Sequence, residues 1–208
     1  MATYKLTYFN LRGLAEITRI MFNIAKVPFE DIRLEYPPKE FAELKAAGKF
    51  AANLNRVPIL DYNGVQIGQS KAIERFVAKK LGFMGTNDIE EAQVDMMCEH
   101  VRDIRIKYNE IRFNKSGEEL EAAKKNFIVN DLGVWLEKLE NVVPNSIYSV
   151  GDKLSLADIN IYLLILDFFT PSEEVEKAKE NCPKLKAIAN NVAEVAKDWL
   201  ASRPVTMF

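Results

Sequence analysis

The spacing of apolar residues along this chain changes character near residue 82. Before that point, alternating apolar positions predict strands, and apolar positions three or four residues apart predict helices. The expected order is strand, helix, strand, helix, two strands and helix, over residues up to Tyr8, 13–26, 29–34, 40–47, 57–67 and 70–81. Asn63-Gly64 predicts a hairpin turn because both residues tolerate positive φ. Ser70 is expected to cap the last of these helices.

Beyond residue 82 the pattern is helical as far as the C-terminus. Segments over residues 89–114 and 118–142 place apolar residues at helical spacing, and a buried helix is expected from Ser155. Ser155 and Asp158 have capping-box spacing directly before the apolar run, which we interpret as a structural feature. The pattern therefore predicts an α/β domain over residues 1–81, followed by an all-α domain over residues 82–208.

Composition narrows the class of protein. A chain of 208 residues with 48% apolar content can bury one sizeable core or two modest ones, and a formal charge of -2 offers no basic field for nucleic acid. The N-terminus lacks the features of a secretory signal, and the most apolar segment, "INIYLLILDFF", is too short to span a bilayer. We therefore expect a cytoplasmic protein that binds neither nucleic acid nor membrane.

The cysteines and the histidine indicate no metal chemistry. The chain has two cysteines, Cys98 and Cys182, and a single histidine, His100. Their spacing matches neither a disulfide framework nor a zinc site. We therefore expect no metal centre.

Tyr8 is the first candidate for chemistry. It ends a strand-like run, and Gly13 follows just before a helical pattern, so the chain turns between a strand and a helix at this point. Tyr8 is either a buried strand aromatic or a hydroxyl displayed at the turn.

Val57-Pro58 is a second local signal. Proline at the opening of a strand lacks the N–H that a sheet ladder needs. A proline at this position indicates either an edge strand or a cis peptide bond that turns the backbone groups of Val57 toward a ligand.

Four segments, in order, carry a specific resemblance. "YKLTYFNLRGLAE", "RVPIL", "GQSKAIERF" and "YSVGDKLSLAD" resemble the landmarks of cytosolic glutathione transferases, and the first is most similar to the sigma class, which includes glutathione-dependent prostaglandin D synthases. The resemblance implies a thioredoxin-like N-terminal domain joined to an α-helical C-terminal domain. It also implies a homodimer, a cis Pro58, and glutathione as the co-substrate.

The resemblance also implies roles for individual residues. The Tyr8 hydroxyl donates to the glutathione sulfur and favours the thiolate, which is the nucleophile. The remaining glutathione contacts are implied at Phe41, Lys45, Val57, Pro58, Gln69, Ser70 and, from the partner subunit, Asp103. Gln69 and Ser70 bind the γ-glutamyl carboxylate at the start of a helix. The alternative for Lys45 is a solvated charge, and the alternative for Asp103 is a solvated acidic face paired with Arg102, Arg105 and Lys107.

Several positions depart from the sigma pattern. Leu14 stands where an arginine near the thiolate is common, Phe41 replaces a tryptophan, and extra residues lie between Phe41 and Val57. Glu110 and Asn160 occupy positions that shape the prostaglandin pocket in the isomerases. We expect a second-substrate pocket formed by Leu14, Ile104, Tyr108 and Asn160.

The expected activity is attack of glutathione thiolate on small electrophiles, with peroxide reduction also possible. One alternative is a glutathione-dependent isomerase of the prostaglandin D synthase type. Another is a non-catalytic binding or structural protein related to the lens crystallins that share this fold.

Overall fold

The structure is a computed structural model and describes residues 2–206. Its internal contacts divide the chain into two compact units. Residues 2–83 and 196–206 form the first unit, and residues 84–195 form the second. No helix among residues 2–206 combines the length and the apolar character that crossing a membrane requires.

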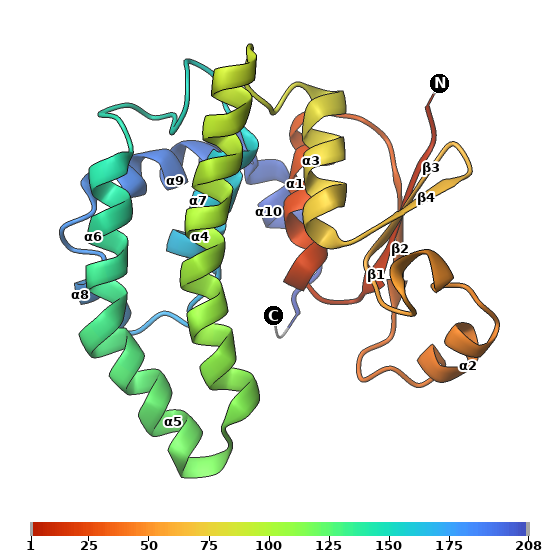
Figure 1. The fold of residues 1–208 in the computed structure, drawn as a ribbon, viewed down its shortest axis with the longest axis horizontal. Coiled ribbons are helices and arrows are strands. Elements are labelled where there is room, and N and C mark those ends of the chain that lie inside the picture. Colours follow the sequence, from red (N-terminus) through yellow and green to blue (C-terminus); the bar gives the residue numbers. More distant parts are fainter. Residues whose placement is uncertain (1, 207–208) are drawn as a thin grey trace. The chain divides into compact units, whose positions relative to one another are not determined.

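The first unit is built on a mixed sheet of four strands in the order β2-β1-β3-β4 (Figure 1). The strands are β1 (Tyr4–Phe9), β2 (Glu30–Leu34), β3 (Ile59–Tyr62) and β4 (Val65–Gly68). β1 is parallel to β2 and antiparallel to β3, and β3 is antiparallel to β4. The parallel pair is joined by a helical crossover, and the antiparallel pair β3–β4 is the predicted hairpin. Asn63 and Gly64 have φ values of 52° and 85° at its turn, which confirms the expected positive φ at both positions.

Two helices of the first unit, α1 (Glu16–Ile24) and α3 (Ser70–Leu81), pack side by side (Figure 1). The shorter elements are η1 (Gly13–Ala15), α2 (Phe41–Ala46) and η2 (Ala51–Asn53). The helix predicted over residues 13–26 therefore begins as a separate 3-10 turn. The prediction that Ser70 caps α3 is wrong. Gln69 is the N-cap residue, with φ 66° and ψ 113° and no side-chain cap, so Ser70 is already the first helical residue.

The second unit contains only helices. They are α4 (Asp88–Asn114), α5 (Gly117–Asn126), η3 (Phe127–Leu132), α6 (Gly133–Val142), α7 (Leu156–Tyr162), η4 (Leu163–Asp167), α8 (Glu173–Ala178) and α9 (Pro183–Val195). The segment predicted as one helix over residues 118–142 is helical throughout, but six of its residues, η3, form a π-helical stretch. Every residue of α7 is buried, and α7 packs against α4 and α9.

The predicted capping box at the start of α7 is present. Asp158 accepts from the backbone N–H of Ser155 at 2.7 Å and from the backbone N–H of Ser149 at 2.6 Å. A single buried carboxylate thus satisfies donors of the helix and of the preceding loop, which fixes where the central helix of this unit begins.

The C-terminal segment belongs to the first unit. Helix α10 (Lys197–Ser202) and the residue that follows it are tied to α1 through Glu16, which is 1% exposed. Glu16 Oε1 accepts from Trp199 Nε1 at 3.0 Å and from Arg203 Nη1 at 2.9 Å. The domain limits expected from sequence, 1–81 and 82–208, assign this segment to the helical domain and stay a prediction.

Replacing Trp199 by phenylalanine should destabilise the protein through the loss of one donor to Glu16. A hydrogen bond to a buried charged group contributes roughly 1.5–3 kcal/mol, so we expect a loss of that size in the free energy of unfolding measured by urea denaturation. Trp135→Phe is the matched control, because the Trp135 ring is only half-buried and lies among lysine side chains. Equal effects of the two substitutions would show that the Glu16 contact contributes little.

Candidate active site

Tyr8 lies at the end of β1, and its hydroxyl is held against the backbone of Gly13. Gly13 has φ +42°, and a Cβ atom there would lie 2.7 Å from the Tyr8 hydroxyl oxygen and 2.9 Å from a ring carbon. Any other residue at position 13 would therefore strain the turn and displace the phenol. Tyr8 is only 7% exposed, so the two sequence-based alternatives combine: the ring belongs to the core, and the hydroxyl lies at the turn.

The peptide bond between Val57 and Pro58 is cis, as the resemblance implies. The bond between Tyr36 and Pro37 is also cis, which the sequence analysis does not predict. Val57 and Pro58 are buried at the point where the chain enters β3. The predicted backbone contact of Val57 with glutathione stays a prediction.

Asn53 joins the segment around Pro58 to the start of α3. Its side-chain amide donates to the Pro58 carbonyl oxygen at 2.9 Å, and its Oδ1 accepts from the Gln69 backbone N–H at 3.0 Å. Gly68 makes this possible, because a Cβ there would lie 2.6 Å from Asn53 Oδ1. Asn53 therefore positions two predicted glutathione-binding segments at once. The sequence analysis missed it, and the only available signal was the glycine directly before Gln69.

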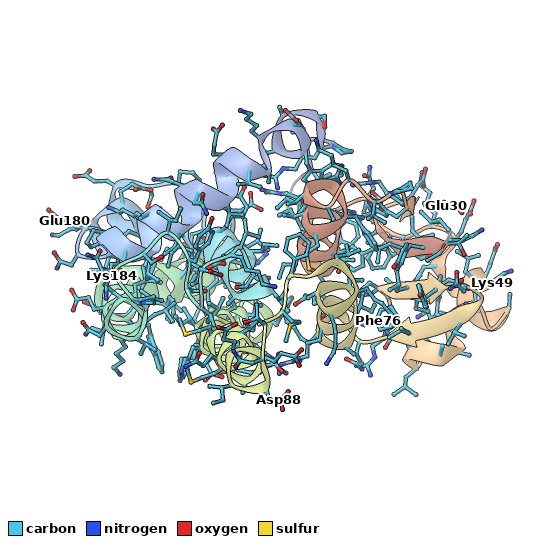
Figure 2. The ribbon with its side chains drawn as sticks, turned by 90° about the horizontal axis from the view of Figure 1, so that it is seen from above. Glu30, Lys49, Phe76, Asp88, Glu180 and Lys184 are labelled. Carbon is cyan, nitrogen blue, oxygen red and sulfur yellow. The ribbon has the colours of Figure 1, made fainter. Side chains whose placement is uncertain are left out.

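The predicted pair Phe41 and Lys45 comes together on α2. Lys45 Nζ lies 4.7 Å from the centre of the Phe41 ring. The same ring packs against Phe9 and Phe50, each at a centroid distance of 5.1 Å. Because Phe9 follows Tyr8 in β1, an aromatic cluster connects the lysine-bearing helix to the strand that carries Tyr8. Lys49 is exposed at the outer edge of this unit (Figure 2).

The residues predicted for the second-substrate pocket have different environments. Leu14 is 46% exposed on η1, so it presents an apolar side chain next to Gly13. Tyr108 packs against Phe127, Phe168 and Phe169 at centroid distances of 5.0–5.7 Å. Burial there raises the pKa of the Tyr108 phenol, so the hydroxyl stays protonated at neutral pH.

Asn160 is a structural residue in this arrangement. It is 1% exposed, and its amide nitrogen donates to the Leu156 carbonyl at 2.9 Å and contacts Cys98 Sγ at 3.5 Å. Its amide nitrogen is therefore engaged inside the helical unit. The expectation that Asn160 lines the second-substrate pocket stays a prediction.

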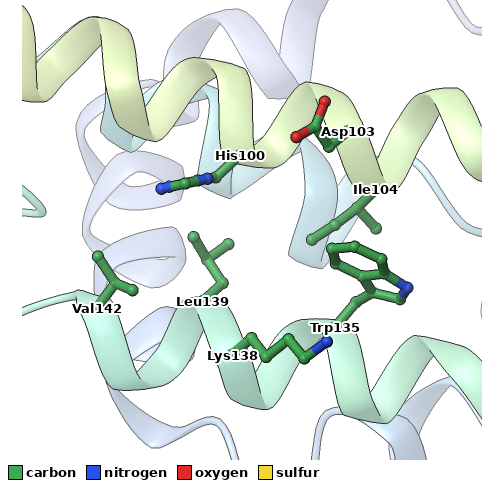
Figure 3. Close-up of a pocket in the computed structure, with 7 residues that line it drawn as sticks. All are labelled: His100, Asp103, Ile104, Trp135, Lys138, Leu139 and Val142. Atoms are coloured by element: carbon green, nitrogen blue, oxygen red, sulfur yellow. The ribbon is translucent and has the colours of Figure 1, made fainter.

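Asp103 and Ile104 line a pocket of about 200 Å³ between α4 and α6 (Figure 3). The other lining residues are His100, Trp135, Lys138, Leu139 and Val142. The basic neighbours of Asp103 have contacts elsewhere. Arg102 pairs with Glu99 at 2.9 Å, Arg105 lies 4.8 Å from the Phe168 ring centre, and Lys107 lies 5.1 Å from that of Trp135. The partner-subunit role of Asp103 stays a prediction.

The structure indicates no role for the two cysteines at the candidate site. Cys98 and Cys182 are buried, and neither forms a disulfide bond among residues 2–206. Burial raises the pKa of Cys182 to about 11, so its thiol is protonated and a poor nucleophile at neutral pH. Among residues 2–206, no group of three or more His, Cys, Asp or Glu side chains is arranged to hold a metal ion.

The chain combines an α/β unit, with a tyrosine at its strand-to-helix turn, and an all-helical unit. Comparison with known protein families identifies the class of protein that has this organisation. Family models match the glutathione S-transferase N-terminal domain over residues 4–79 and the C-terminal domain over residues 102–203. The chain belongs to the glutathione S-transferase family. The predicted fold class, a thioredoxin-like domain followed by an all-helical one, is confirmed.

Relatives that match along nearly the whole chain include both glutathione S-transferases and a prostaglandin D synthase. The chain is 36% identical over 217 residues to Glutathione S-transferase 3 of Caenorhabditis elegans, with 100% of both chains covered. It is 31% identical over 208 residues to hematopoietic prostaglandin D synthase of Gallus gallus, with 99% of both covered. Among solved structures, a monomeric glutathione S-transferase of the hookworm Necator americanus matches with a TM-score of 0.80 and 32% identity, over 99% of this chain and 100% of that one.

Asn53→Ala should disturb the site without replacing any residue that the resemblance assigns to glutathione. Losing both hydrogen bonds should lower the free energy of unfolding by about 1–3 kcal/mol and weaken glutathione binding. Asn141→Ala, the same change at an exposed position on α6, should stay within about 0.5 kcal/mol of the unsubstituted protein. Urea denaturation and calorimetric titration with glutathione test both effects. Unchanged glutathione affinity in Asn53→Ala would mean that Asn53 serves the fold alone.

Proposed function

We propose that this chain is a glutathione S-transferase in which Tyr8 holds bound glutathione as a thiolate for attack on small, apolar electrophiles. The observation that carries the proposal is the Tyr8 hydroxyl, held against Gly13 at the turn from β1 to η1. A free thiol is mostly protonated at neutral pH, and a hydrogen bond donated to sulfur stabilises the anion. The sulfur then forms the new bond to carbon while the leaving group departs, or while a proton is taken up in an addition.

Glutathione is proposed to bind along the first unit. The N-terminus of α3 offers backbone N–H groups to the γ-glutamyl carboxylate, beside Gln69 and Ser70. Val57 pairs with the cysteinyl segment through its backbone, before Pro58. Lys45 binds the glycine carboxylate from α2. Support comes from Asn53, which ties two of these segments together, and from the Phe41 ring beside Lys45.

The second substrate is proposed to contact Leu14, whose exposed apolar side chain lies on η1. Ile104 and Tyr108 are assigned to the same pocket by the resemblance alone. An apolar wall of this kind suits aryl and alkenyl electrophiles and organic hydroperoxides.

The enzyme class, the oligomeric state and the cellular location are also proposals. The first sequence landmark favours a sigma-like enzyme, and we propose a cytoplasmic homodimer with a role in detoxification. The hookworm relative is described as monomeric, so the state of assembly needs its own measurement.

A glutathione-dependent isomerase is the second candidate. The identity with the Gallus gallus prostaglandin D synthase favours it. The leucine at position 14 and the buried amide of Asn160 argue for a pocket of different shape. Assaying the protein and glutathione with an aryl halide, an alkenal, an organic hydroperoxide and prostaglandin H2 separates the two. Turnover of prostaglandin H2 alone would replace the transferase proposal with the isomerase, and no turnover of any substrate would favour a binding or structural role.

Tyr8→Phe keeps the ring and removes only the hydroxyl. Losing a hydrogen bond to the thiolate and transition state should raise the activation free energy by about 2–4 kcal/mol, which lowers kcat roughly 30- to 900-fold, with little change in glutathione affinity. Steady-state kinetics with an aryl halide and calorimetry with glutathione measure the two quantities. Normal turnover in this variant would remove Tyr8 from the chemistry.

Asp103→Asn tests whether a partner subunit completes the site. If Asp103 binds the γ-glutamyl ammonium across a dimer, its loss should weaken glutathione binding by about 1–3 kcal/mol and leave turnover at saturating glutathione almost intact. Asp88→Asn, the same change at an exposed position of the same helix, is the matched control. Sedimentation must show that the variant assembles as the unsubstituted protein does. Normal affinity in an intact dimer, or a monomeric protein that binds glutathione fully, would favour the alternative that Asp103 belongs to a solvated acidic face.

A further inference from the structure

Lys45 is a half-buried lysine that forms no ion pair with any other residue among residues 2–206. Lys71, a half-buried lysine of the same unit, pairs with Glu74 at 2.8 Å. Lys45 instead extends over an aromatic ring, with Nζ 4.7 Å from the centre of Phe41. A ring attracts a cation through its quadrupole but carries no formal charge. The ammonium of Lys45 is therefore held in place while its charge stays available to an anionic ligand.

Helical spacing brings Phe41 and Lys45 together. The two residues are four positions apart on α2, so their side chains lie next to each other on one face of the helix. The Phe41 ring is itself fixed from two sides. It packs edge-on against Phe9 of β1 and also against Phe50, which is 3% exposed. None of the six residues of α2 is buried and no side chain caps its start, so these ring contacts help to set where the helix and its lysine lie.

The ring also affects how Lys45 meets a carboxylate. A lysine side chain has many rotamers, and a ligand binds only the fraction of molecules that hold the ammonium in the binding position. The contact with Phe41 raises that fraction before the ligand arrives, which is preorganisation. A phenyl ring has no N–H group and donates no hydrogen bond to the ligand. Recognition of the carboxylate therefore depends on the charge of Lys45.

We propose that Phe41 is a positioning residue for Lys45, which holds the ammonium where it pairs with the glycine carboxylate of glutathione. The site is then selective for tripeptides whose C-terminal carboxylate is free. The inference rests on the proposed function and deepens it, because it gives Phe41 a role that needs no contact with glutathione.

The test compares glutathione with its glycine ethyl ester, in which an uncharged ester replaces the carboxylate. Calorimetric titration of the whole protein measures both affinities, and the unsubstituted protein should bind the ester more weakly. Phe41→Leu keeps an apolar side chain but removes the ring. It should weaken glutathione binding roughly 2- to 5-fold, because a cation–ring contact at a partly exposed site contributes about 0.5–1 kcal/mol. It should leave the affinity for the ester unchanged, and Phe41→Tyr, which keeps the ring, should bind both ligands normally.

Two further variants separate this role from a purely structural one. Phe76→Leu removes another half-buried ring of the same unit, which has Lys80 Nζ 5.7 Å from its centre, and should leave both affinities unchanged (Figure 2). Lys45→Met should weaken glutathione binding roughly tenfold or more, because it removes a charged partner of the carboxylate. Adding Phe41→Leu to Lys45→Met should then have no further effect. A ring that only supports the fold would weaken glutathione and ester equally, with or without Lys45.

Circular dichroism confirms that each variant is folded, and Phe41→Met takes the place of Phe41→Leu if the leucine variant does not fold. Equal losses for the two ligands, no loss for glutathione, or the same loss in the Lys45→Met background would overturn the proposal for Phe41. Equal affinities of the unsubstituted protein for glutathione and the ester would overturn it too, because Lys45 would then not recognise the carboxylate. Failure of the unsubstituted protein to bind glutathione would instead overturn the proposed function.

Discussion

The burial of a positive charge constrains the first unit more than any other interaction. Placing the Arg19 guanidinium in the interior is costly unless acceptors surround it. Those acceptors come from three parts of the chain: the turn after β1, the strand β2 and a neighbouring position on α1. Satisfying one side chain therefore fixes the relative positions of the strand that carries Tyr8, its parallel neighbour and the crossover helix between them.

A second polar side chain, that of Asn53, has the same function near β3 and β4, the other two strands of the sheet. Asn53 lies in a short 3-10 turn, yet its amide is buried and connects the carbonyl of Pro58 to the N–H of Gln69. The Pro58 carbonyl and the Gln69 N–H both lie at strand or helix ends, and Asn53 supplies each with a hydrogen-bond partner. Irregular backbone at the proposed glutathione site is thus held by side chains that apolar periodicity does not reveal.

Much of the fold follows from local sequence signals. The hairpin at Asn63-Gly64 and the capping box at Ser155 and Asp158 were predictable because both depend on residues a few positions apart. Arg19 and Asn53 were not, because an arginine in an amphipathic helix is normally expected in solvent, and its main partner lies in another element twelve residues later. The role of Tyr8 needed the resemblance, since the pattern alone left a core aromatic and a displayed hydroxyl open. Only the structure shows that the ring is buried while the hydroxyl meets Gly13.

The attachment of α10 to α1 has a consequence for how the chain folds during synthesis. The thioredoxin-like unit starts at the N-terminus, but two donors to its buried Glu16 belong to residues that are translated after the entire helical unit. Until then, the carboxylate of Glu16 keeps Arg19 as a neighbour and lacks both hydrogen bonds from the C-terminal segment. The N-terminal unit thus reaches its final stability only after the last helix has left the ribosome, and a fragment cut after residue 83 would lack this stabilisation.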